Sequence, residues 1–216
     1  MAGEVVQPVD DSRLLAPPVV VHAGVDFDAP PDWATEYVLS DPAPPKLRFE
    51  MHDPNSRSDI RRMVREVLAV EAPVHKDRVL RAVRGAWGVG RAGHRIRAAF
   101  DEIVQELARR SELERVEGFL RRPGEVFEAV RIPTNDPETV RGVAFVPPEE
   151  LENAVYWLVH DAQSIARADV RMHATRLFGW ARAGPDISAA IDDAVHRMIE
   201  QGYLAHSSGK LEVATE

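Results

Sequence analysis

Residues 71–107 have the sequence EAPVHKDRVLRAVRGAWGVGRAGHRIRAAFDEIVQEL, and their apolar side chains predict two helices joined by a short turn. The apolar positions are Val79, Leu80, Val83 and Trp87 in the first half and Ile96, Phe100, Val104 and Leu107 in the second. Both sets recur with the period of a helix, and Gly88 and Gly90 interrupt the pattern between them. The stretch therefore predicts a helix-turn-helix.

The flanking sequence extends this pair of helices to a winged helix-turn-helix. An apolar stripe from Ser58 predicts a preceding helix that ends before Pro73. Val74 and His75 then suit a short first strand. Residues 113–120, LERVEGFL, place a glycine between two apolar-containing runs, which favours a hairpin over more helix. One module is expected to span residues 56–123.

The module is expected to occur twice, because the chain resembles itself at an offset of 91 residues. The aligned pairs include Val74 with Ile165, Gly88 with Gly179, Arg91-Ala92-Gly93 with Arg182-Ala183-Gly184, Ile96 with Ile187, Asp101 with Asp192, Leu113 with Leu204 and Gly118 with Gly209. Two unrelated amphipathic helix pairs would account for the apolar matches but not for a shared Arg-Ala-Gly. Repetition at a fixed offset indicates two copies of one unit. We expect a mainly α fold with small β wings: two tandem winged helix-turn-helix modules, the second at residues 148–216.

The remaining sequence forms an arm and a linker. Residues 1–55 are acidic and rich in proline, which forbids long helices; residues 19–25 could form one strand, and Trp33 and Tyr37 could dock on a folded module. Residues 124–147 are expected to form a strand-containing linker, because Val126–Ile132 alternates well enough for a strand.

Composition favours a cytoplasmic protein with no membrane partner. The 216 residues include no cysteine, which excludes disulfides and thiolate zinc sites. The first eleven residues are acidic where a signal peptide would be basic, and no apolar run reaches the ~18 residues of a membrane span.

The net charge of −8 conceals an uneven distribution. Residues 1–55 carry 3 basic and 10 acidic groups, whereas residues 56–123 carry 16 basic and 10 acidic groups. Residues 124–150 carry 2 basic and 6 acidic groups, and residues 151–216 carry 6 and 9. Only the first module is basic, which is the charge pattern of a nucleic-acid-binding surface.

The predicted DNA contacts lie on this basic module. A recognition helix enters the major groove with its N-terminal residues near the base edges. The candidate nucleic-acid-binding residues are Lys76, Arg78, Arg81, Arg84, Arg91, His94, Arg95, Arg97, Arg121 and Arg122. Cations at a helix start oppose the macrodipole by ~0.3–1 kcal/mol each, and phosphates or guanine edges would compensate for that cost. The bland alternative is that these are solvated surface arginines, with Arg97 and Asp101 an i,i+4 pair.

The second module carries Pro185, Asp186 and Ser188 where the first has His94, Arg95 and Arg97. We expect it to lack DNA contact and to face protein, by packing on the first copy, by self-association or by docking onto an ATPase. Trp157, Phe178 and Trp180 are expected to be core residues.

Catalysis is not expected. The sequence has no G-x-S-x-G, no H-E-x-x-H and no cysteine nucleophile, and its eight histidines lack metal-ligand spacing, so neither a cofactor nor a metal is predicted. An enzyme built from carboxylates would instead need a deep polar pocket between the modules.

Four segments of the chain resemble a known family: residues 70–75 (VEAPVH), 86–96 (AWGVGRAGHRI), 147–151 (PPEEL) and 177–182 (LFGWAR). They are similar to the C-terminal domain of unknown function in large bacterial superfamily I DNA helicase-like proteins, where it follows an ATPase core and a nuclease domain. The resemblance spans roughly residues 37–213 and implies DNA-related work, but it supplies no catalytic residues. This chain has no G-x-x-x-x-G-K-[ST] phosphate loop, so helicase activity does not transfer.

We therefore expect a non-catalytic DNA-binding accessory or C-terminal region of helicase or nuclease machinery. Double-stranded DNA is the favoured partner, and a helicase-like ATPase or nuclease is a possible second one. The alternative is a winged-helix module that docks onto a protein partner, with the arginines serving an acidic surface. Oligomeric state does not follow from the sequence.

Overall fold

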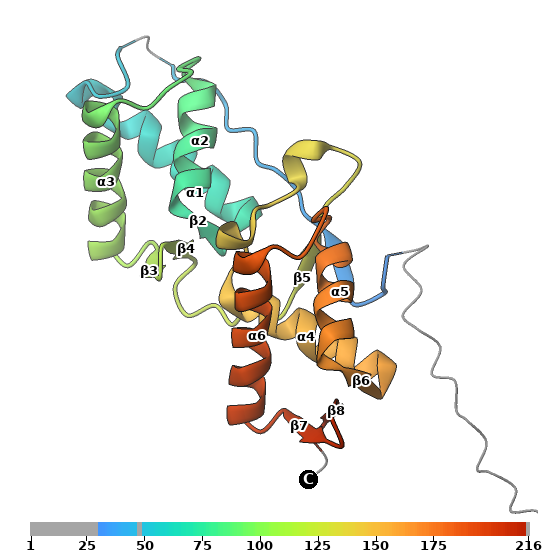
Figure 1. Cartoon of the computed structure of the whole chain (residues 1–216). Helices are drawn as coiled ribbons and strands as arrows, with labels where there is room; N and C mark the ends of the chain where they lie inside the picture. The colour runs from blue at the N-terminus through green and yellow to red at the C-terminus, as the bar shows by residue number, and fades with distance from the viewer. Residues whose placement is uncertain (1–29, 47–48, 215–216) are drawn as a thin grey trace, which may run out of the picture.

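The computed structural model of the chain describes residues 30–46 and 49–214. Within these residues it contains six α-helices and small β-sheets, so the expectation of a mainly α fold with small β elements is confirmed. Two α/β units lie at opposite ends of the molecule, with β5 between them (Figure 1). The strand predicted at residues 19–25 lies outside the described residues.

The first unit has three helices and a three-stranded sheet. Its elements are α1 (Arg57–Glu71), β2 (Val74–His75), α2 (Lys76–Ala86), α3 (His94–Arg109), β3 (Glu114–Val116) and β4 (Phe119–Arg121). The sheet is antiparallel with strand order β2-β4-β3. The two helices and the hairpin expected in residues 76–121 therefore lie where the apolar period and the glycines placed them.

The apolar stripes of the three helices form one core. Ile60 and Val64 of α1, Val79 of α2, and Phe100 and Ile103 of α3 are all fully buried in it. Burial of this size stabilises a fold by ~1.5–3 kcal/mol per large side chain, so helix packing dominates the stability of the unit. Trp87, at the end of α2, packs against the rim of this core and donates from Nε1 to the carbonyl of Phe49 at 3.0 Å.

The second unit has the same order of elements. They are α4 (Pro148–Ala162), β6 (Ser164–Ala166), α5 (Arg167–Leu177), α6 (Pro185–Glu200), β7 (Leu204–Ser207) and β8 (Lys210–Val213), with strand order β6-β8-β7. Each of its helices begins and ends 91 residues after the matching helix of the first unit. Phe178 and Trp180 are core residues as expected, but Trp157 is only partly buried.

The segments outside the units join them. β1 (Ala34–Glu36) pairs in parallel with β5 (Val130–Ile132), which is shorter than the strand predicted from Val126. Short 3₁₀ turns follow β5 at Pro137–Thr139 (η2) and Val143–Phe145 (η3), and another, η1 (Pro54–Ser56), precedes α1. Tyr37, just after β1, is buried and donates from its hydroxyl to Glu71 at 2.5 Å.

Two fully buried carboxylates hold this joint together. Glu71, at the end of α1, accepts hydrogen bonds from Tyr37 and from Arg78 at 2.7 and 3.0 Å. Glu150, in the first turn of α4, accepts from Arg131 and Arg141, with shortest contacts of 2.6 and 2.7 Å. Arg131 also donates to the carbonyls of Glu71 and Pro73 in the first unit. A single cluster of charges therefore connects the arm, the linker and both units.

Burial is the largest single influence on the pKa values of Tyr37 and Glu150 in this cluster. It raises the pKa of Tyr37, as does the charge of Glu71, so Tyr37 stays protonated and donates. Burial also opposes ionisation of Glu150, but the hydrogen bonds and charges of Arg141 and Arg131 outweigh it and hold the pKa of Glu150 below its ordinary value.

Among the described helices, none is long and apolar enough to cross a membrane.

Candidate nucleic-acid interface

The turn between α2 and α3 is shaped by glycine and by one arginine. Gly88 has φ +71°, a left-handed conformation that costs an L-residue roughly 1–2 kcal/mol. Arg84 donates from its guanidinium to the carbonyls of Val89 (3.0 Å) and Gly90, and so ties the end of α2 to the turn. α3 then begins at His94 after Gly93, which provides no side-chain cap, and no acidic residue occupies its first turn.

A basic hollow lies beside this turn. It has a volume of about 210 Å³, and its lining residues are Asp77, Leu80, Arg81, Arg84, Gly90, Arg91, Ala92, Arg97 and Phe145. Four of the ten predicted DNA contacts, Arg81, Arg84, Arg91 and Arg97, therefore meet in one place. Phe145 comes from the linker, and nothing in its sequence context identified it as a neighbour of this turn.

The predicted contact residues fall into two groups according to their partners. Arg81, Arg91, His94 and Arg95 are exposed and make no hydrogen bond or ion pair within residues 30–46 and 49–214. The others are engaged: Lys76 with Asp101 (2.9 Å), Arg78 with Glu71 (2.7 Å), Arg97 with Asp77 (3.7 Å), Arg121 with Glu149 (2.7 Å) and Arg122 with Glu125 (2.6 Å), besides Arg84 with its two carbonyls.

A row of ion pairs links α1 to α3 and to Glu112, just after α3, and it neutralises part of the positive charge that the sequence suggested. Its pairs are Arg57 with Glu102 (2.9 Å), Arg61 with Glu106 (3.2 Å) and Arg65 with Glu112 (2.7 Å). The three arginines lie four residues apart and so share one face of α1. Charge counts along the sequence could not separate these arginines from those of the turn, because the partner glutamates lie more than forty residues away.

The remaining basic residues concentrate at the turn. Of the 16 basic residues in 56–123, six have no ion pair within the described part of the chain: Arg81, Arg84, Arg91, Arg95, Arg109 and Arg115. Three of them line the basic hollow, and Arg95 lies in the first turn of α3. The acids nearest to them on α3, Asp101 and Glu102, are paired with Lys76 and Arg57. The turn is therefore the place where unneutralised positive charge gathers in this unit.

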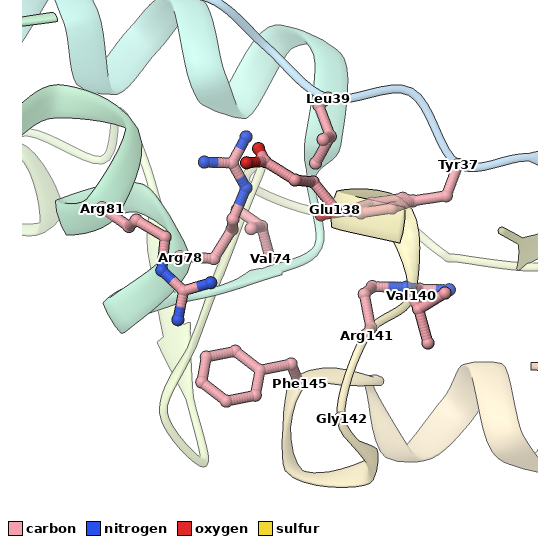
Figure 2. A pocket seen from close by; sticks show the side chains of 10 residues that line it. All are labelled: Tyr37, Leu39, Val74, Arg78, Arg81, Glu138, Val140, Arg141, Gly142 and Phe145. Atoms are coloured by element: carbon pink, nitrogen blue, oxygen red, sulfur yellow. The ribbon is translucent and has the colours of Figure 1, made fainter. Parts of the chain in front are cut away.

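A second cavity, at the joint, adjoins the basic hollow. It has a volume of about 110 Å³, and Figure 2 shows its lining residues: Tyr37, Leu39, Val74, Arg78, Arg81, Glu138, Val140, Arg141, Gly142 and Phe145. Arg81 extends from α2 toward Phe145 of the linker, and these two residues line both cavities. The linker thus borders the candidate DNA surface.

His75 ties the first strand to the same region. Its Nδ1 accepts a hydrogen bond from the backbone N–H of Asp77 at 3.2 Å and caps α2, while its ring packs edge-on against Phe145 at 4.6 Å. Burial lowers the pKa of His75, so the neutral ring that can accept this bond is favoured. Within the described residues, no group of three or more histidine, aspartate or glutamate side chains is arranged to hold a metal ion.

Comparison with known proteins gives one match. Residues 50–98 match a family described as protein of unknown function (DUF3320). The matched segment begins before α1 and ends in the first turns of α3, so it contains α1, β2, α2 and the turn that borders the basic hollow. No curated protein and no solved structure matches the chain.

Proposed function

We propose that the two units are tandem winged helix-turn-helix domains that arose by duplication. Support for a winged helix comes from the order helix, strand, helix, helix, hairpin, with the first strand added to the hairpin. Support for duplication comes from identical helix lengths at a constant offset of 91 residues. The left-handed residues Gly88, Glu117 and Gly118 also recur at that offset as Gly179, Ser208 and Gly209.

The first unit, in this proposal, binds double-stranded DNA through the α2–α3 turn and the start of α3. The observation that carries the proposal is the gathering of Arg81, Arg91 and Arg95, whose side chains have no hydrogen-bond or carboxylate partner in the described part of the chain. Phosphate contacts by such residues supply most of the affinity of DNA-binding proteins. Free N–H groups at the uncapped N-terminus of α3 add donors for a phosphate.

The other predicted residues have smaller roles in this proposal. Arg84 and Arg78 are occupied by internal hydrogen bonds, so Arg84 shapes the turn and Arg78 belongs to the joint. Arg121 pairs with Glu149 of α4, and Arg122 pairs with Glu125 of the linker, so both would have to leave those partners to reach DNA. The sequence resemblance supports a setting in helicase or nuclease machinery, to which this chain would contribute binding and not catalysis.

The test is a fluorescence-anisotropy titration of a labelled duplex of about two helical turns, over a salt series. We compare the wild type with Arg91→Ala/Arg95→Ala and with Arg109→Ala/Arg115→Ala, which removes two unpaired arginines elsewhere on the same unit. The first variant should lower the slope of log K against log salt by about 1.8, since each lost phosphate contact contributes about 0.9. The control variant should keep the wild-type slope.

A third variant, Arg182→Ala, removes the residue of the second unit that matches Arg91, and it should bind as the wild type does. Losses in all three variants that follow only the number of charges removed would mean that binding depends on net charge and not on this surface. Absence of binding at low salt would overturn the proposal.

A further inference from the structure

An aromatic groove lies on the second unit, and it shares no lining residue with the basic hollow. It has a volume of about 600 Å³ and lies between α4, the end of α6, and the segments that contain Trp33 and Phe127. Five of the 13 phenylalanine, tyrosine and tryptophan residues in the described chain line it: Trp33, Phe127, Tyr156, Trp157 and Tyr203. Aromatic side chains on a surface are enriched at protein-binding sites.

Contacts within the chain hold the aromatic side chains of the groove in place. Trp33 stacks on Trp157 with 6.3 Å between ring centroids and 13° between planes, and its Nε1 donates to Asp161 at 2.7 Å. Tyr156 packs edge-on against Trp157 at 5.4 Å. A rigid aromatic surface loses little conformational entropy when it binds.

Polar groups and apolar area remain free at this surface. The hydroxyls of Tyr156 and Tyr203 make no hydrogen bond within residues 30–46 and 49–214. Tyr203 is 55% exposed and Val126 is 81% exposed. A partner could therefore bury apolar area here and satisfy the tyrosine hydroxyls at the same time.

The charge of the lining specifies the kind of partner. Its two acidic residues are Glu128 and Glu152, and no lysine or arginine lines the groove. Glu152 pairs with Arg197 at 2.5 Å, whereas Glu128 is exposed and has no ion pair within the described residues. Tyr203 is exposed, and Tyr156 and Trp157 are partly exposed. Such aromatic side chains beside a free carboxylate suit a lysine or arginine side chain, through cation–π attraction and charge.

The matching face of the first unit shows that the groove is not required by the fold. Ninety-one residues earlier, Tyr156 and Tyr203 correspond to Arg65 and Glu112, which form an ion pair at 2.7 Å. Trp157 corresponds to Glu66, which pairs with Arg62 at 2.7 Å. The first unit closes this face with charge pairs, and the second leaves it aromatic.

We propose that the aromatic groove binds a short segment of a partner protein in which lysine or arginine side chains neighbour apolar ones. The groove and the basic hollow are separate sites, so the chain would hold DNA at one unit and a basic protein segment at the other. This proposal does not rest on the DNA proposal.

The experiment selects a phage-displayed library of random 12-residue peptides on the full-length protein, and then measures the affinity of an enriched peptide by fluorescence anisotropy. We expect enriched sequences to carry lysine or arginine beside apolar residues. Tyr203→Ala should weaken the peptide at least about tenfold, as truncation of a central aromatic contact does. Glu128→Lys should weaken it too, whereas Glu112→Ala, the matching position of the first unit, should leave its affinity unchanged.

Thermal unfolding of each variant checks that it is folded, and Tyr203 and Glu128 are exposed enough to replace safely. Three outcomes would overturn the proposal: no enriched sequence, enriched peptides that are acidic, or binding that Tyr203→Ala does not weaken. Sedimentation analysis tests whether a second copy of this chain occupies the groove instead. If the wild type dimerises and Tyr203→Ala does not, the groove is a contact between copies of this chain.

Discussion

The turn after α2 in the first unit and the turn after α5 in the second have the same backbone but different surroundings. Gly88 and Gly179 have φ angles of +71° and +69°. A side chain at Gly88 would meet no atom within 4 Å in the described chain, whereas Pro133 and Val140 of the linker lie against Gly179. Trp180, next to it, donates from Nε1 to the carbonyl of Arg141 at 2.7 Å.

This difference explains how one local structure can serve two purposes. In the second unit the linker occupies the side of the turn at Gly179 and Trp180, so that side fixes the second unit to the joint. In the first unit the same side is open, and basic residues gather beside it. Under the proposed duplication, one copy of the turn would serve internal packing and the other would remain available to DNA.

The first turns of α1 and α4 each contain an acidic residue, Asp59 and Glu150. The largest difference in stability between matching variants of the two units is expected at these positions. Glu150 is fully buried between two arginines, Arg131 and Arg141, whereas its counterpart Asp59 is 9% exposed and has one arginine, Arg62, at 3.4 Å. Glu150→Gln should lower the free energy of unfolding by about 3–5 kcal/mol, because two buried arginines lose their counter-charge. Asp59→Asn should cost less, about 1–2 kcal/mol, because it removes a single long ion pair and leaves a side-chain oxygen that can still accept a hydrogen bond. Urea unfolding measures both, and equal losses would contradict this account of the joint.

The difference in stability between the wild type and Glu150→Gln should depend on pH in a defined direction. Since the pKa of Glu150 is lowered from its ordinary 4.5 by folding, its contribution to stability is complete above that pH and is lost as the pH falls through the folded-state pKa. The gap in urea midpoint between wild type and Glu150→Gln should therefore be constant from pH 7 to about pH 5 and shrink toward pH 3. A gap that widens on acidification would reverse the assignment.

A smaller effect is expected at the two turn glycines. Gly88→Ala should destabilise by about 1 kcal/mol, the cost of placing a Cβ in the left-handed region. Gly179→Ala should cost about 2–3 kcal/mol, since its Cβ would also lie 2.8 Å from Cγ of Pro133 and force the linker to move. Urea unfolding of both variants tests whether the linker packs on the second turn, and matching losses would show that it does not.

The helices could be predicted closely because their apolar periods and stop signals are local. The helix predicted to begin at Ser58 and to end before Pro73 is observed at Arg57–Glu71. The strand predicted from Val126 begins only at Val130, because parallel pairing with Ala34–Glu36 sets its extent, and that partner is about a hundred residues away. Local patterns cannot report such a pairing.

The candidate site was less predictable than the fold. Sequence alone assigned Arg91, His94 and Arg95 to the start of the recognition helix. The structure places His94 and Arg95 in the first turn of α3 and Arg91 in the turn before it, and all three residues are exposed. It could not show that Arg78 is committed to Glu71 across the joint, nor that Phe145 borders the basic hollow. Both depend on how the linker folds back. The aromatic groove was missed for the same reason, because Trp33, Phe127 and Trp157 meet only in the folded chain.

The smallest effect concerns an ion pair that has opposite polarity in the two units. Arg61 of α1 pairs with Glu106 of α3 at 3.2 Å, and at the matching positions Glu152 of α4 pairs with Arg197 of α6 at 2.5 Å. Exchanging the second pair, Glu152→Arg with Arg197→Glu, should change stability by less than about 0.5 kcal/mol, because no other ionised group within the described residues pairs with either one.

The same exchange in the first unit should lower the urea midpoint, because the new arginine at position 106 would face Arg57 and Arg110, which now lie 3.7 and 2.7 Å from Glu106. The two double variants differ only in the unit that carries them, so a tolerated exchange in both would show that the row of ion pairs on the first unit acts as independent pairs. A loss confined to the first unit would show that its charges form a network, and such a network would hold α1 and α3 together beneath the proposed DNA surface.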